Sequence, residues 1–94
     1  GVAISPQNLV LSTVQGDVSV HTAIPYSSVE LSTVRLEGIA PESMKSDLCG
    51  NLVAKFPEDA VEAIVSPPSA TLTLTGKYTW GEEFSGSDTV KVTP

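Results

Sequence analysis

The stretch ATLTLTGKYTWGEEFSGSDTVKVT, residues 70–93, decides the fold class. Up to Tyr78, mostly apolar residues at even positions alternate with threonines and a lysine at odd positions, which is the period-2 pattern of a half-buried strand. After the turn residues, Phe84, Val90 and Val92 keep the even parity. This pattern predicts a β-hairpin whose two arms share one apolar face.

The same parity selects the loop of the hairpin. A two-residue turn at Trp80-Gly81 would break the parity and would force a positive φ on a tryptophan. A three-residue loop over 79–81, with Gly81 in the left-handed region, keeps the parity and places Gly76 opposite Phe84. We therefore expect a hairpin that carries Trp80 at its tip.

Shorter patterns occupy the rest of the chain. Alternating residues predict strands at Asn8–Ser12, Asp17–Ile24, Val34–Glu37 and Leu52–Phe56. We expect an entry segment at Gly1–Pro6, with Pro6 at a strand edge or turn, a short turn at Val29–Thr33 and an irregular polar loop at Ala40–Gly50.

One short helix is predicted near 58–65. Pro57 suits a first helical position, and Glu58 and Asp59 follow it, where the helix dipole favours carboxylates. Val61, Ile64 and Val65 have the i, i+3, i+4 spacing of a helix of about two turns.

Together these elements indicate an all-β fold: a small antiparallel β-sandwich of about six to seven strands, with the strand order left open. The predicted core consists chiefly of Leu9, Leu11, Val18, Val20, Leu36, Leu52, Phe56, Ile64, Leu72, Leu74 and Val90.

The bulk composition limits the function classes. A chain of 94 residues forms one domain, residues 1–94, and buries roughly two-thirds of the surface that its unfolded form exposes. The formal charge is −6 and lysines and arginines form no cluster, so we expect no nucleic-acid partner. Apolar runs are far shorter than the ~20 residues of a membrane span, so no membrane insertion is expected. The start at Gly1, without signal-peptide features, indicates a module excised from a longer protein.

Three longer strings in the chain resemble a known family. They are YSSVELSTVRLEG (Tyr26–Gly38), NLVAKFPEDAVEAIV (Asn51–Val65) and TLTLTGKYTWGEEFSGSDTVKV (Thr71–Val92). In this order they resemble small Ig-like β-sandwich modules of modular secreted and cell-surface proteins in bacteria and archaea, which often sit beside dockerin-type, cohesin-type or enzymatic modules. The resemblance covers most of the chain from about Val18. It implies an Ig-like sandwich, an extracellular or cell-surface location, and neighbouring domains of the same polypeptide as partners.

The chain departs from that pattern at two places. Many relatives carry an Asp-x-Asp-Gly-Asp run that resembles a calcium loop, where this chain reads SDLCGNLVAKF. Asp47 and Asn51 remain as oxygen donors, which makes a weak calcium candidate because calcium takes 6–8 oxygens. We expect no cofactor. The second departure is Trp80, where relatives commonly carry a small polar residue.

The residues that could support catalysis are not arranged for it. His21 is the single histidine and lies on the polar side of its strand. Cys49 is the single cysteine, which excludes an internal disulfide, and we expect it to be partly buried at the edge of the core. The acidic pairs Glu58/Asp59 and Glu82/Glu83 are interpreted as a helix start and a solvated strand end. We therefore expect that the protein is not an enzyme.

Two functional hypotheses remain. The first is a non-catalytic structural or spacer module, monomeric because Lys77 and Lys91 guard the hairpin against edge pairing. The second is a carbohydrate-binding module in which Trp80, Tyr78 and Tyr26 stack on a polysaccharide at the 78–81 hairpin loop. Under the first hypothesis, Tyr78 packs in the core and Trp80 folds over the sandwich end or meets a neighbouring domain.

Overall fold

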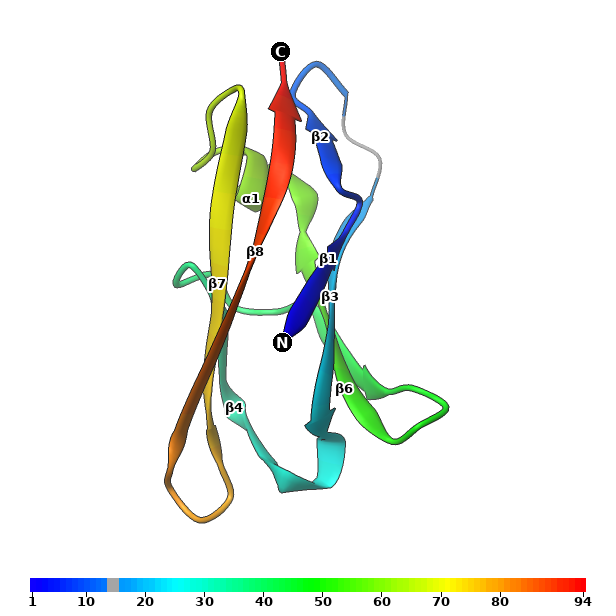
Figure 1. Cartoon of the computed structure of the whole chain (residues 1–94), viewed down its shortest axis with the longest axis vertical. Coiled ribbons are helices and arrows are strands. Elements are labelled where there is room, and N and C mark those ends of the chain that lie inside the picture. Colours follow the sequence, from blue (N-terminus) through cyan, green and yellow to red (C-terminus); the bar gives the residue numbers. More distant parts are fainter. Residues whose placement is uncertain (14–15) are drawn as a thin grey trace.

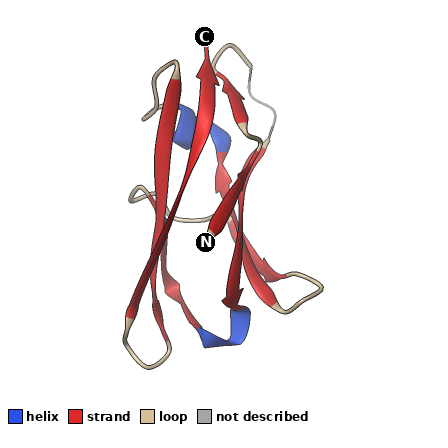
Figure 2. Ribbon diagram, in the orientation of Figure 1, coloured by secondary structure: helices blue, strands red, loops and turns tan. Residues whose placement is uncertain are grey.

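The computed structural model describes residues 1–13 and 16–94, and strands dominate it (Figure 2). The described strands are β1 (Val2–Ser5), β2 (Asn8–Val10), β3 (Asp17–Pro25), β4 (Val29–Leu36), β5 (Ser43–Ser46), β6 (Asn51–Pro57), β7 (Ser69–Tyr78) and β8 (Glu83–Thr93). A 3₁₀ turn, η1 (Tyr26–Ser28), and a short helix, α1 (Glu58–Glu62), complete the described elements.

The strands form two four-stranded sheets that pack face to face (Figure 1). One sheet has the order β1-β3-β6-β5 and the other the order β2-β8-β7-β4. This is the order of an Ig-type sandwich whose first strand is divided between both sheets. The predicted all-β sandwich is confirmed, and β1 and β2 together account for the one strand by which the described count exceeds seven.

The division of the first strand falls at Pro6, which lies between β1 and β2 as expected for a turn position. β1 pairs antiparallel with β3 in one sheet, whereas β2 pairs parallel with β8 in the other. Among the described strand pairs, β2–β8 is the one parallel pair of an otherwise antiparallel sandwich. The Asp88 carboxylate on β8 fixes the segment in which the chain passes from one sheet to the other. Its Oδ2 accepts hydrogen bonds from the Ile4 backbone N–H and the Gln7 side-chain amide, both at 2.9 Å.

The core lies between the sheets and follows the alternation of the strands. Nine of the eleven predicted core residues are buried: Leu9, Val18, Val20, Leu36, Leu52, Phe56, Leu72, Leu74 and Val90. Leu11 is only partly buried, at the end of β2. Further buried side chains, beyond the predicted core residues, include Ile4, Val29, Val34, Val53 and Val61.

Gly76 and Phe84 face each other across the β7–β8 hairpin, in the predicted register. A Cβ at Gly76 would lie 2.5 Å from the Phe84 Cζ, so the ring occupies the space that any larger residue would need. The glycine thus lets a large aromatic side chain lie flat across the neighbouring strand, where it closes one end of the core.

Strands lie in three segments for which no strand was predicted, so those predictions are wrong. Val29–Thr33 is the first part of β4, where the register with β7 shifts between Glu30 and Arg35. Such a bulge removes the regular alternation from which a strand is recognised. The Thr33 hydroxyl accepts a hydrogen bond from the Lys77 backbone N–H at 2.8 Å there.

The other missed strands are edge strands. β5 lies within the predicted loop Ala40–Gly50 and pairs only with β6, and β1 lies within the predicted entry segment. Each strand has a neighbour on one side and packs few side chains against the core: Ile4 is buried and Met44 is partly buried.

The helix α1 begins at Glu58, so Pro57 is its N-cap residue rather than its first helical residue, and the helix ends at Glu62 rather than near 65. The Ile64 N–H donates a 3.2 Å hydrogen bond to the carbonyl of Val61, three residues earlier, which closes a tighter turn than that of an α-helix. Ile64 therefore leaves the face of the buried Val61 and is 52% exposed, so its predicted place in the core is wrong. Within the described residues, no helix has the length and apolar character needed to span a membrane.

Candidate functional site

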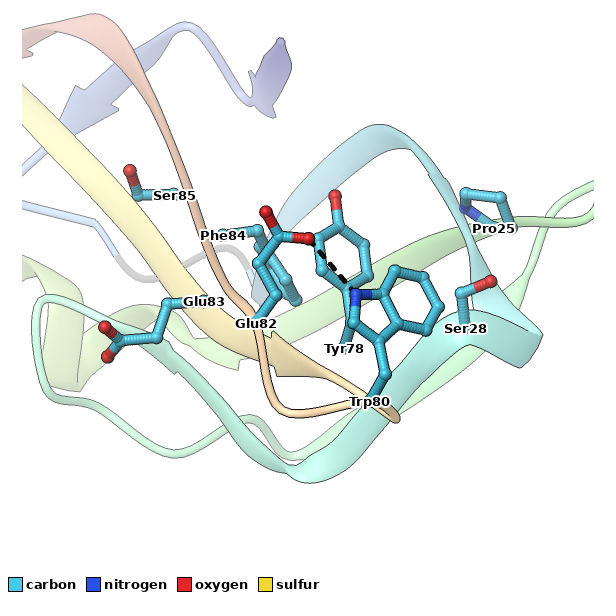
Figure 3. Close-up of a pocket in the computed structure, with 8 residues that line it drawn as sticks. All are labelled: Pro25, Ser28, Tyr78, Trp80, Glu82, Glu83, Phe84 and Ser85. Carbon is cyan, nitrogen blue, oxygen red and sulfur yellow. Dashed lines mark hydrogen bonds between the residues drawn. The ribbon is translucent and has the colours of Figure 1, made fainter.

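A hollow of about 500 Å³ opens at the end of the sandwich where the β7–β8 hairpin meets η1 (Figure 3). Its lining consists of Pro25, Ser28, Tyr78, Trp80, Glu82, Glu83, Phe84 and Ser85. The two segments are tied together beside it, because the Thr79 N–H donates a 2.9 Å hydrogen bond to the Ser28 carbonyl. The hollow therefore lies between the η1 turn on one side and, on the other, the tip of the hairpin with the start of β8.

The tip of the hairpin has the predicted three-residue loop. The Tyr78 N–H donates to the Glu82 carbonyl at 2.8 Å, and the Gly81 N–H donates to the Tyr78 carbonyl at 2.9 Å. Gly81 has a φ of 95°, which glycine adopts without steric cost. This loop preserves the shared apolar face and fixes where the Trp80 side chain starts.

Three aromatic rings form a stack from the core to the surface at this tip. Phe84 is buried and lies against Tyr78, with ring centroids 5.2 Å apart and planes tilted by 53°. Tyr78 is half-buried and stacks on Trp80, with centroids 4.6 Å apart and planes 5° from parallel. Trp80 remains 64% exposed. Tyr78 thus packs against the core as its parity predicts, and it also serves as the support for an exposed indole ring.

A carboxylate fixes the other end of the indole. The Trp80 Nε1–H donates a 3.1 Å hydrogen bond to Glu82 Oε1, which Figure 3 shows as a dashed line. The predicted solvated strand end at Glu82/Glu83 is therefore incomplete as a description, because Glu82 has a specific side-chain partner. The sequence signal for this contact is the three-residue loop itself, which returns the chain to Glu82 beside the base of the Trp80 side chain.

The charged side chains that line the hollow are acidic. Among the described residues, its lining contains the carboxylates of Glu82 and Glu83, the hydroxyls of Ser28 and Ser85, and no lysine, arginine or histidine. A negatively charged ligand would meet like charges there, whereas hydroxyl and amine donors would meet acceptors.

Tyr26 lies at the same end but does not line the hollow. It begins η1, its N–H donates to the Gly50 carbonyl at 2.9 Å, and its side chain is partly buried against the core. The three aromatic residues predicted as a binding set are thus brought to one end of the sandwich, and Trp80 and Tyr78 are the two that share the hollow. Pro25 and Ser28, which form the opposite wall, follow no motif that the sequence offers.

Asp47 and Asn51, the calcium candidates, lie at the two ends of the β5–β6 turn. Asp47 Oδ1 accepts hydrogen bonds from the backbone N–H groups of Asn51 (3.0 Å) and Cys49 (2.8 Å). These bonds lower the pKa of the Asp47 carboxyl, and the bond from Asn51 contributes most to this lowering. This carboxylate oxygen is therefore already committed to holding its own turn. Across residues 1–13 and 16–94, no group of three or more His, Cys, Asp or Glu side chains is placed to hold a metal ion.

Cys49 is exposed, so the predicted partly buried position is wrong. The turn projects beyond the edge of its sheet, and the neighbouring Leu48 is fully exposed with it. His21 lies on the exposed side of β3, opposite Ala3 and Val53 in the neighbouring strands.

A second group of carboxyls surrounds α1, away from the hollow. Glu58 and Asp59 occupy the first helical turn as predicted, and Glu58 is buried. The neighbouring Glu58 carboxyl raises the pKa of Glu62, because both groups cannot keep a negative charge at hydrogen-bond distance without cost. Asp17 raises the pKa of Glu42 in the same way.

Comparisons of the chain with models of known protein families, with curated proteins and with solved structures found no match.

Proposed function

We propose that this chain is a non-catalytic structural module that sets the distance and direction between neighbouring domains of a secreted or cell-surface protein. The observation that carries the proposal is the course of the chain through the sandwich. The end of the sandwich that carries η1 and the β7–β8 hairpin tip is called the loop end. β1 starts opposite Thr22 and runs away from the loop end, because it is antiparallel to β3. β8 runs from the hairpin tip to the opposite end, where the C-terminus lies (Figure 1).

Preceding and following domains would therefore leave in opposite directions along the long axis. The sandwich measures 41 × 23 × 20 Å, so this axis is about twice as long as the other two. Both the first and the last strand are paired within the sheets, which limits swivelling of attached chain at either end. These features suit a semi-rigid spacer.

The secreted or cell-surface context rests on a different support, namely the resemblance of three sequence strings to modules of such proteins. Threonine- and serine-rich outer faces on β7 and β8 are compatible with it. Their hydroxyls pair across the strands, as in Thr71 with Thr89 and Thr73 with Ser87, both at 2.8 Å.

The proposal is tested by measuring the distance between two reporters. Fluorescent proteins are fused to Gly1 and Pro94, and single-molecule energy transfer is recorded for this fusion and for one with a Gly/Ser linker of equal length. A flexible linker of this length has an r.m.s. span of roughly 50–60 Å with a broad distribution. We expect a clearly narrower distribution for the sandwich. A width equal to that of the linker fusion would contradict a spacer role.

A further inference from the structure

We propose that the hollow between the β7–β8 hairpin and η1 binds an uncharged polysaccharide, with the exposed face of Trp80 as its stacking platform. This binding site goes beyond the proposed spacer function and does not depend on it.

Trp80 is exposed and yet held in place. A single exposed apolar side chain on a protein surface needs no functional explanation. Here, however, the indole is stacked 4.6 Å from Tyr78 and its N–H is bonded to Glu82 Oε1, so both its tilt and its direction are fixed. Tyr78 in turn lies against the buried Phe84. A ring that is fixed before binding loses little conformational entropy on binding, which favours ligand affinity.

The stacking of Trp80 on Tyr78 favours a flat ligand. Because Tyr78 covers one face of the indole in a nearly parallel stack, one flat apolar face of Trp80 is left for a partner. A pyranose ring has a matching face of C–H groups, and flat rings of this kind pack well on aromatic side chains. Nearly parallel rings do not enclose a volume, so the arrangement is poorly suited to surrounding a quaternary ammonium group.

The groups around the platform suit the hydroxyls of a sugar. Glu82, Glu83, Ser28 and Ser85 line the same hollow and carry carboxylate and hydroxyl oxygens, and a sugar presents several hydroxyl donors at its edge. The absence of basic residues from the lining disfavours uronate or sulfated chains, which would bring negative charge to two carboxylates. The ligand class is therefore an uncharged glycan.

The position of the hollow in the fold also suits binding. It lies at the end of the Ig-type sandwich that carries both the η1 turn and the hairpin tip (Figure 1), and these two segments with the start of β8 line it. Loops held by a rigid sheet scaffold are common binding surfaces. A volume of about 500 Å³ lies within the usual range of ligand sites, roughly 300–1,000 Å³.

The test uses the whole chain, because Trp80 is its single tryptophan and reports directly on the site. Fluorescence is titrated with soluble uncharged polysaccharides (β-glucan, xylan and mannan) and with the anionic alginate and polygalacturonate. We expect a saturable emission shift with at least one uncharged polymer and none with the anionic ones. No shift with any uncharged polymer, or a shift with the anionic polymers alone, would overturn the proposal and would leave the spacer function untouched.

Variants then assign the binding to the platform, with retention in polysaccharide-containing native gels as the readout. Trp80→Ala should weaken retention at least tenfold, and Glu82→Gln should weaken it several-fold while preserving the indole contact through the amide oxygen. Leu48→Ala is the matched control, because Leu48 is also an exposed apolar side chain on a loop of the molecule. It should bind like the unaltered chain.

Circular dichroism checks that each variant is folded. Should Trp80→Ala unfold, Trp80→Phe and Glu82→Gln carry the test. Retention of Trp80→Ala or Glu82→Gln equal to that of the unaltered chain would overturn the proposal, because binding would then not use the platform.

Discussion

Two loop tips of this sandwich expose a large apolar side chain, and they hold it in different ways. At the β7–β8 tip, Trp80 is fixed by an aromatic stack and by a carboxylate on its indole N–H. At the β5–β6 tip, Leu48 is fully exposed, and the adjacent Asp47 carboxylate fixes the backbone of the turn rather than the side chain.

The difference shows that an exposed side chain is not necessarily one whose orientation is fixed in advance. Both side chains would be selected by a search for exposed apolar residues, but only Trp80 has side-chain contacts that define its orientation. A candidate site is therefore better recognised by what holds an exposed group than by the exposure itself.

The largest effect on this difference between the two tips is expected when the base of the aromatic stack is removed. Phe84→Ala should lower the free energy of unfolding by about 3 kcal/mol, because it removes a buried ring and leaves a cavity over Gly76. Urea denaturation followed by circular dichroism measures the loss, and Trp80 emission should shift to the red as its support loosens. Phe84→Leu, which keeps much of the apolar volume, should cost clearly less. A loss below about 1 kcal/mol for Phe84→Ala would show that the stack is not anchored in the core.

A smaller effect is expected from the charge that holds the other tip. The pKa of Asp47 is lowered in the folded state, so its contribution to stability is present above the unfolded pKa of about 3.9 and is lost as pH falls through the folded pKa. Asp47→Asn should therefore be less stable than the unaltered chain at neutral pH.

The two should converge as pH falls through the folded pKa of Asp47, in thermal melts recorded across this range. Asp88, whose pKa is also lowered, chiefly by the Ile4 backbone N–H, is present in both chains and so cancels from the comparison. A difference between the two proteins that is constant with pH would mean that the Asp47 charge does not hold the turn.

The smallest effect is expected from the exposed side chain at the β5–β6 tip. Leu48→Ala should change the free energy of unfolding by less than about 0.5 kcal/mol, because the side chain is fully exposed and contacts no core residue. The urea midpoint of this variant should coincide with that of the unaltered chain. A clear destabilisation would indicate that the β5–β6 tip is packed in solution.

The sequence predicts the β7–β8 hairpin in detail because two signals agree there. The parity of Phe84 and Val90 and the glycine at 81 favour the same register, which places Gly76 opposite Phe84, and the structure has it. The same parity argument places Tyr78 on the core side and Trp80 at the tip.

The rest of the fold is less readable for physical reasons. β5 buries little, so its sequence needs no alternation, and the bulge in β4 removes the alternation that Val29 and Val34 would otherwise show. The i, i+3, i+4 stripe fails at Ile64 because the helix stops before that residue. At the candidate site, the Trp80–Glu82 contact depends on side-chain direction in the loop, which residue spacing alone does not specify.

The parallel pairing of β2 with β8 has a mechanical consequence. If tension is applied through neighbouring domains, the N-terminal segment is drawn toward the loop end and the C-terminus toward the opposite end. The force then runs along both strands, so their hydrogen bonds, including Lys91 N–H to Gln7 carbonyl and Leu11 N–H to Thr93 carbonyl at 2.8 Å, are sheared together rather than opened one after another. We therefore expect the short β2–β8 pair to bear the pulling force along the length of its strands.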